Sequence, residues 1–149
     1  SFQYLAIHSP VFAAMFFGNF AEKGKKEVAV KDVVYEEFID LLQLIYLETT
    51  RISDRMVVYI LKLADQFQMK RVLDLSVNHL IHSKGFDTIS KLLLAHQYRL
   101  ESLKDYCLQS FTNVTDLTMK LKASPEFDDL SAETKASILE RIVKLTELP

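Results

Sequence analysis

YLAIHSPVFAAMFFGNFAE, residues 4–22, contains the longest uninterrupted apolar run of the chain. Ser9 followed by Pro10 is typical of a helix start, because the hydroxyl can accept a hydrogen bond from a backbone N–H and proline is tolerated at the first helical position. Gly18 is typical of a helix end. The sequence therefore predicts a helix from Pro10 to Phe17.

This helix is apolar on every face. The residues from Val11 to Phe17 are all apolar, and at about 100° per residue they cover the whole circumference. Phe12, Phe16 and Phe17 each carry about 150 to 250 Å² of side-chain surface, which is a large patch for a soluble monomer to leave in water. We therefore expect one side to pack into a core and the other against a second protein.

The same segment resembles a known domain. Leu5 to Phe12, the following Met15-Phe16 and the triplet Phe20-Ala21-Glu22 resemble the BTB (POZ) domain, and most closely the BTB half of the MATH-BTB proteins that are expanded in nematodes. In that family the equivalent helices form the homodimer interface. Helix facing and the resemblance together imply these dimer residues: Tyr4, Leu5, Val11, Met15 and Phe16.

Composition fits an ordinary globular protein. Of the 149 residues, 49% are apolar and 26% charged, and the net charge of −2 does not indicate a nucleic-acid or anionic-membrane surface. The single cysteine, Cys107, excludes an internal disulfide and fits a reducing compartment, so we expect an intracellular protein of the cytoplasm or nucleus. The longest apolar run is far short of the roughly 20 residues that span a bilayer.

The start of the chain differs from the family pattern. It begins at Ser1 rather than Met, and the strand hairpin that opens a BTB domain is absent from it. We therefore expect a truncated sheet, with dimerisation resting on the helices. An unstable fragment without function is one alternative.

The order of expected elements gives a mainly α fold with an α+β remnant. Glu27 to Lys31 alternates like a strand with Val28 and Val30 inward, and residues 48–52 form a connector with a possible very short strand. Apolar spacing predicts a helix over 35–47 and a helix pair over 54–82. This pair matches the C-terminal half of a BTB domain, so we assign residues 1–84 to it.

Residues 85–149 form a second expected module, which is helical. Two helices near residues 87–97 and 101–111 make a hairpin that resembles the three-box of MATH-BTB proteins, the first part of a BACK-like region. Helices over 114–121 and 131–146 complete the chain. No internal repeat is expected.

The sequence contains no recognisable catalytic motif. With three glycines, at positions 18, 24 and 85, neither a P-loop nor a Rossmann phosphate loop can be written. His79 and His82 could share a metal only with a further ligand, and solvated histidines are the alternative. Cys107 is interpreted as a small hydrophobe. We therefore expect no enzyme, no cofactor and no metal.

The triplet from Phe20 to Glu22 has a functional interpretation through the resemblance. BTB adaptors of cullin-RING ubiquitin ligases carry an apolar-x-Glu triplet in this loop, and its apolar side chain enters a cullin pocket. The alternative is that Phe20 packs on the domain's own core. The neighbouring lysines 23, 25 and 26 are interpreted as a solvated turn. The implied cullin-binding residues are Phe20, Glu22, Tyr46, Glu48 and Leu92.

Together these features predict a non-catalytic, dimeric BTB adaptor. It would link a protein substrate, read by a domain absent from these 149 residues, to a cullin-RING ubiquitin ligase. The alternative function is a BTB scaffold that self-associates or recruits co-repressors without binding a cullin. Neither a nucleic acid nor a membrane is an expected partner.

Overall fold

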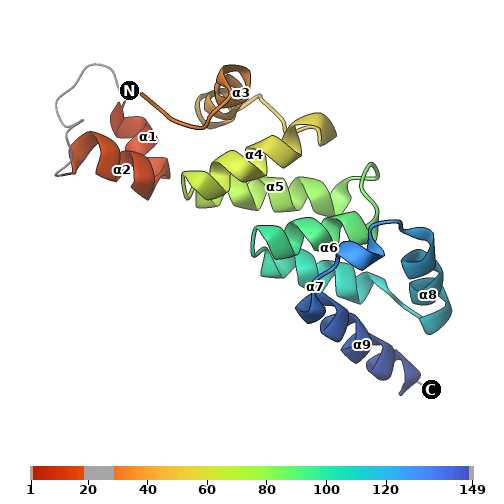
Figure 1. The fold of residues 1–149 in the computed structure, drawn as a ribbon. Coiled ribbons are helices and arrows are strands. Elements are labelled where there is room, and N and C mark those ends of the chain that lie inside the picture. The colour runs from red at the N-terminus through yellow and green to blue at the C-terminus, as the bar shows by residue number, and fades with distance from the viewer. Residues whose placement is uncertain (1, 19–28, 148–149) are drawn as a thin grey trace. The chain divides into compact units, whose positions relative to one another are not determined.

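The computed structural model describes residues 2–18 and 29–147, and these residues form α-helices, one short 3₁₀ helix and no strand. The chain divides into two compact units, Ser1–His79 and Leu80–Pro149, each with its own core. Figure 1 shows the helices in chain order. Their bounds are α1 Phe2–His8, α2 Pro10–Phe17, α3 Tyr35–Tyr46, α4 Asp54–Gln66, α5 Lys70–His82, α6 Thr88–Gln97, α7 Glu101–Ser110, α8 Val114–Ala123, the 3₁₀ helix η1 Phe127–Asp129 and α9 Ala132–Thr146. The mainly α fold class is therefore confirmed.

The N-terminal unit is built around α2, whose bounds are those expected from Ser9, Pro10 and Gly18. The Ser9 hydroxyl accepts a hydrogen bond from the Phe12 backbone N–H at 3.1 Å. Phe12 is 1% exposed, and its ring stacks on that of Phe67 with the centroids 4.4 Å apart. Buried residues of α3, α4 and the start of α5 join the same core.

The expected strand is wrong in its described part. Ala29 to Lys31 lie in irregular backbone, and residues 48–52 likewise contain no strand. A strand needs a partner strand to satisfy its backbone groups, and the described residues supply none. Val30 nevertheless packs against the core, as its alternating pattern indicated. Glu27 and Val28 lie outside the described residues.

The two helical hairpins, α4–α5 and α6–α7, share a pattern of buried positions. Seven positions of the first hairpin are buried, and the positions 31 residues further along the chain are buried in the second hairpin. Leu61 and Leu92 are the first such pair. In the first hairpin they are Leu61, Leu63, Ala64, Met69, Val72, Ser76 and Leu80; in the second they are Leu92, Leu94, Ala95, Leu100, Leu103, Cys107 and Phe111. The expectation that the chain has no internal repeat is therefore wrong.

The turns of the two hairpins are also alike. Gln68 has φ of 51° and Arg99 has φ of 55°, the left-handed conformation that ends many helices. The backbone N–H of the next residue then donates five residues back: Met69 to the Ala64 carbonyl and Leu100 to the Ala95 carbonyl, both at 2.8 Å. Similar burial and similar turn bonds make each hairpin the same local structure.

The C-terminal unit adds α8 and α9 to the second hairpin. Ser131 caps α9 by accepting from the Thr134 backbone N–H at 3.1 Å. Arg141 of α9 donates two hydrogen bonds, at 2.8 and 3.2 Å, to the carbonyl oxygen of Phe111, which follows α7. One face of α9 is thereby held on the unit through Thr134, Ile138 and Leu145, which are buried.

Candidate interaction surfaces

Helices α1 and α2 both bury apolar residues and expose others. Phe12 and Phe16 are buried, whereas Ile7 is 77% exposed and Phe17 is 48% exposed. Pro10 and Ala14, which share the outer face of α2 with Phe17, are also exposed. The two-sided character expected of this segment is therefore present, and among the described residues its outer side is an exposed apolar surface.

The five residues predicted for the dimer interface lie on the inner side and the flanks of these helices. Leu5 and Phe16 are buried in the core of the N-terminal unit, and Tyr4, Val11 and Met15 are partly buried against it. The Tyr4 hydroxyl donates to the Ile45 carbonyl oxygen at 3.0 Å. The interface itself stays a prediction, but these side chains chiefly hold the helices on the unit.

The outer residues that the sequence reasoning missed share one angular sector of α2. At about 100° per residue, Pro10, Ala14 and Phe17 fall within a narrow arc opposite Phe12 and Phe16. The run from Val11 to Phe17 hides this arc because hydrophobicity alone does not separate its two sides. Only the position of the buried core does so.

The residues predicted to contact a cullin are placed differently from one another. Phe20 and Glu22 lie outside the described residues, as do the three lysines that follow them. Tyr46 and Glu48 are exposed at the end of α3. Leu92 is 1% exposed inside the C-terminal unit, so its side chain offers no surface to a partner. The cullin site as a whole stays a prediction.

Tyr46 and Leu47 form an exposed aromatic and apolar pair at the end of α3. Their exposed fractions are 42% and 50%. The Tyr46 ring lies 4.7 Å from that of Tyr4, and partial burial, followed by the nearby Tyr4, raises the pKa of Tyr46. The pair is thus anchored on one side while it presents the other to solvent.

A cavity of about 580 Å³ lies beside the start of α3. The Tyr59 hydroxyl donates to Oδ2 of Asp40 at 2.5 Å within its lining. Burial and this hydrogen bond raise the pKa of Tyr59 to about 12, so the phenol remains a donor at neutral pH. Both groups have a structural role here, because each satisfies the other.

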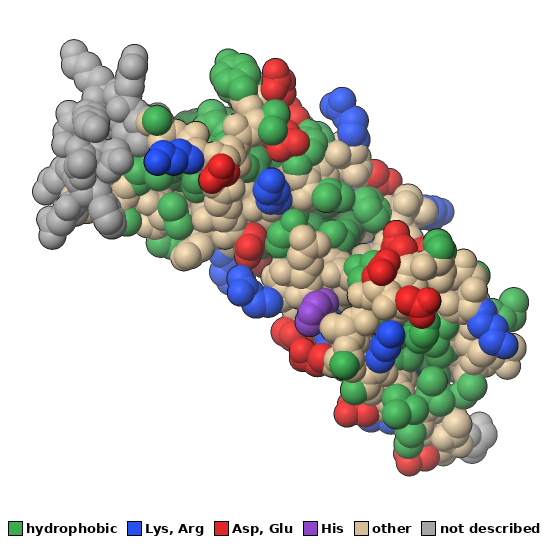
Figure 2. Space-filling view, viewed as in Figure 1, with side chains coloured by type: hydrophobic (Ala, Val, Ile, Leu, Met, Phe, Trp, Pro, Cys, Tyr) green, Lys and Arg blue, Asp and Glu red, His purple; other side chains and the backbone are tan. Residues whose placement is uncertain are grey.

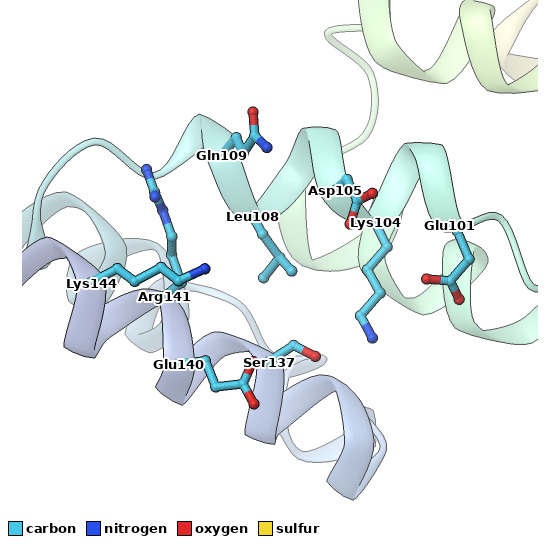
Figure 3. A pocket seen from close by; sticks show the side chains of 9 residues that line it. All are labelled: Glu101, Lys104, Asp105, Leu108, Gln109, Ser137, Glu140, Arg141 and Lys144. Carbon is cyan, nitrogen blue, oxygen red and sulfur yellow. The ribbon is translucent and has the colours of Figure 1, made fainter.

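A second groove, of about 280 Å³, lies between α7 and α9. Figure 3 shows Leu108 pointing from α7 toward α9, with charged side chains of both signs around it. Lys104 reaches Glu133 at 3.9 Å, and Arg141 is held by the Phe111 carbonyl. The mixed charges give the groove no net preference for an anion or a cation. Its lining is Glu101, Lys104, Asp105, Leu108, Gln109, Ser137, Glu140, Arg141 and Lys144.

Chemical sites are not evident in the described part of the chain. Among those residues no three His, Cys, Asp or Glu side chains gather around a possible metal position. Nε2 of His79 lies 2.6 Å from Oδ1 of Asp54, so this histidine joins α5 to α4. Cys107 is buried, and burial raises the pKa of its thiol to about 11. The thiol is therefore protonated and inaccessible at neutral pH.

Residues 2–18 and 29–147 also include no helix that is both long enough and apolar enough to cross a membrane.

Comparison with known proteins agrees with this architecture. Residues 3–84 match the BTB/POZ domain model. The chain is 42% identical over 142 residues to "BTB and MATH domain-containing protein 38" of Caenorhabditis elegans, covering 95% of the chain and 36% of the relative. It is 37% identical over 145 residues to "BTB and MATH domain-containing protein 36" of the same organism, covering 97% and 45%.

A relative of another kind is human "Kelch-like protein 6", 31% identical over 140 residues, with 91% of the chain and 21% of the relative covered. The chain thus spans less than half the length of each of these three curated relatives. The domain model covers more than half of the chain itself. The chain therefore belongs to the BTB/POZ domain family.

Proposed function

We propose that this chain is the BTB portion of a non-catalytic adaptor that self-associates and links a protein substrate to a cullin-RING ubiquitin ligase. The observation that carries the proposal is the BTB/POZ match over residues 3–84, together with the triplet from Phe20 to Glu22 at the position where family adaptors hold their cullin-binding residues. Substrate reading would belong to a domain outside these 149 residues.

The proposed cullin surface combines the triplet with the end of α3. Phe20 supplies the apolar anchor and Glu22 the charged neighbour. Tyr46, Leu47 and Glu48, which are exposed, supply further contacts. Interfaces of this kind gain affinity from one desolvated aromatic anchor beside a charged hydrogen-bonding group. Leu92 is buried in the hairpin that we assign to the three-box-like module, so we leave its side chain out of the proposed contact.

The proposed self-association surface is the outer face of α1 and α2. Ile7, Ala14 and Phe17 are exposed there, and a second copy would cover them. Substituting Phe16 with a charged residue would not test this surface, because Phe16 is only 6% exposed and its loss would disrupt the core. Phe17 offers the cleaner substitution.

Calorimetric titration with the N-terminal domain of a BTB-binding cullin tests the ligase function. We expect saturable binding with a free energy of roughly −8 kcal/mol or better, and a loss of at least about tenfold in affinity when Phe20→Ala and Glu22→Ala are combined. Lys25→Ala, three residues beyond Glu22 in the sequence, is the control and should bind like the parent. No heat from folded protein would contradict the adaptor function.

The alternative function, a self-associating or co-repressor-recruiting scaffold without a cullin, rests on the same exposed faces of α1 and α2. Sedimentation analysis of Ile7→Glu with Phe17→Glu tests them. A clear weakening of self-association, with Tyr35→Glu unchanged as an exposed control, supports this surface. Dimerisation without cullin binding would favour the scaffold.

Two further assignments complete the proposal. A boundary at Gly85 would separate the BTB domain, residues 1–84, from a three-box-like or BACK-like module, residues 85–149. The single buried cysteine supports an intracellular setting, in the cytoplasm or the nucleus.

A further inference from the structure

The last helix, α9, has an apolar face that no other described part of the chain covers. Its inner face is buried through Ile138 and Leu145. On the opposite face Leu139 is 61% exposed and Val143 is 49% exposed. Ala132, Ala136 and Thr146 are exposed along the same line. Figure 2 shows hydrophobic side chains gathered over the region where Figure 1 places α9.

The spacing along this line is that of a coiled-coil seam. Residues 132, 136, 139, 143 and 146 are separated alternately by four and three positions, which is the heptad pattern of a and d sites. Ala136 and Val143 then occupy a sites, while Ala132, Leu139 and Thr146 occupy d sites. A β-branched residue at an a site with leucine at a d site favours a parallel coiled coil of two helices.

Charges beside the seam indicate what covers it. Lys135 precedes the seam at a g site, and Glu140 follows five residues later at an e site. In a parallel pair the g side chain of one helix faces the following e side chain of the other. A second copy of α9 would therefore form the Lys135 to Glu140 pair twice, once in each direction.

An antiparallel pair of the same helices would be disfavoured. There, e sites face e sites, which would place Glu133 against Glu140 of the second copy twice. Glu140 makes no ion pair with the described residues. The Lys135 ammonium lies 5.2 Å from the centre of the Phe127 ring, a contact that it would exchange for the pair with Glu140 of the second copy. The sequence of charges thus selects one orientation.

We propose that α9 is a second self-association surface, on which α9 of another copy of this chain docks in parallel and in register. This surface is separate from the outer face of α1 and α2 and does not depend on it. The contact is short, a single helix of 15 residues, so its affinity should be modest and concentration-dependent.

The test uses the chain carrying Ile7→Glu and Phe17→Glu, which removes the other proposed surface. Sedimentation equilibrium over a concentration series should show a monomer–dimer equilibrium. Leu139→Glu should raise the dissociation constant at least about tenfold, because it places two charges in the seam. Met119→Glu on α8 is the matched control, since Met119 is 65% exposed but lies outside the heptad. A monomer throughout, or equal effects of both substitutions, would overturn the proposal.

Charge exchange decides the orientation. In a parallel pair Glu140→Lys should weaken self-association about threefold by opposing two lysines on each side, and mixing it with the Lys135→Glu chain should restore a heterodimer. In an antiparallel pair Glu140→Lys would instead strengthen association through Glu133. Strengthening, or a failure of the mixed chains to pair, would overturn the parallel arrangement.

Discussion

The hydroxyl of Ser9 donates a 2.5 Å hydrogen bond to the carbonyl oxygen of Phe67, 58 residues further along the chain. The Oγ atom of Ser9 also accepts a hydrogen bond from the Phe12 backbone N–H and caps α2. Ser9 is completely buried, and Phe67 lies where α4 ends. One small side chain therefore fixes both the start of the apolar helix and its position against the end of α4.

Ser9→Ala should destabilise the chain by about 2 to 4 kcal/mol. The loss of a helix cap costs about 1 kcal/mol, and a buried carbonyl left without its donor costs a further 1 to 3 kcal/mol. Urea denaturation, followed by the near-ultraviolet signal of the aromatic core, measures the change.

Ser131→Ala provides the comparison for this prediction, because Ser131 caps α9 in the same way through the Thr134 N–H but is less buried. It should cost about 1 kcal/mol. Equal losses for the two serines would mean that the bond to Phe67 contributes little.

Cys107→Ser should keep the fold and alter the alkaline stability. At the equivalent position of the first hairpin, the Ser76 hydroxyl donates to the Val72 carbonyl at 2.8 Å, so a serine at 107 has the Leu103 carbonyl in the same relation. We expect a change of no more than about 1 kcal/mol at neutral pH.

The pH dependence follows from the thiol. Burial raises the pKa of Cys107 from 9.0 to about 11, so the folded state binds its proton more tightly than the unfolded state does. The stabilising contribution is complete below pH 9 and is lost as pH rises through the folded pKa near 11. The free energy of unfolding of the parent, minus that of Cys107→Ser, should therefore decrease as the pH rises from about 9 to about 11. Urea titrations at several pH values measure this difference. If the stability of the parent and that of Cys107→Ser changed equally with pH, the result would contradict a buried thiol.

Features that depend on residues close together in the sequence, such as helix ends, were predicted correctly. Ser9, Pro10 and Gly18 gave the bounds of α2, and the helices with periodic apolar residues were found. The second partner of Ser9 was not predictable, because nothing near residue 9 indicates Phe67. The strand was wrong because alternation around Val30 reports burial, whereas a strand also needs a neighbouring strand.

The repeated hairpin and the exposed faces were missed for related reasons. Leu61, Leu63 and Ala64 recur as Leu92, Leu94 and Ala95, but other equivalent positions differ in residue type, as Ser76 and Cys107 do, so the full extent of the repeat is visible only in burial. The run from Val11 to Phe17 carries too little contrast to separate its inner and outer sides. The predicted roles of Phe20 and Glu22 depend on a partner surface, which no property of this chain alone determines.

Tyr59→Phe should lower stability by about 1 kcal/mol. It removes the donor from the Asp40 carboxylate, to which the phenol bonds at 2.5 Å, and hydrogen bonds to charged groups are worth more than neutral ones. The site is partly exposed, so water replaces part of the loss. Tyr35→Phe is the control, because Tyr35 is 73% exposed and should change the urea midpoint little. If Tyr59→Phe did not change the stability, the hydrogen bond between Tyr59 and Asp40 would not contribute to it.

Gln68→Gly should stabilise the first hairpin by about 0.5 to 1 kcal/mol. Gln68 has φ of 51°, a conformation that is costly for a residue with a Cβ and free of that cost for glycine. This relief must exceed the extra entropy that glycine brings to the unfolded chain. Gln66→Gly is the comparison: Gln66 is also an exposed glutamine, but it is the last residue of α4 and has helical backbone. Its side chain also donates an exposed hydrogen bond to the Lys31 carbonyl oxygen at 3.4 Å, which contributes little in water. There glycine should cost up to about 1 kcal/mol. Opposite signs for two glutamines two residues apart, measured by thermal and urea denaturation, would assign the effect to backbone conformation, and equal signs would exclude it.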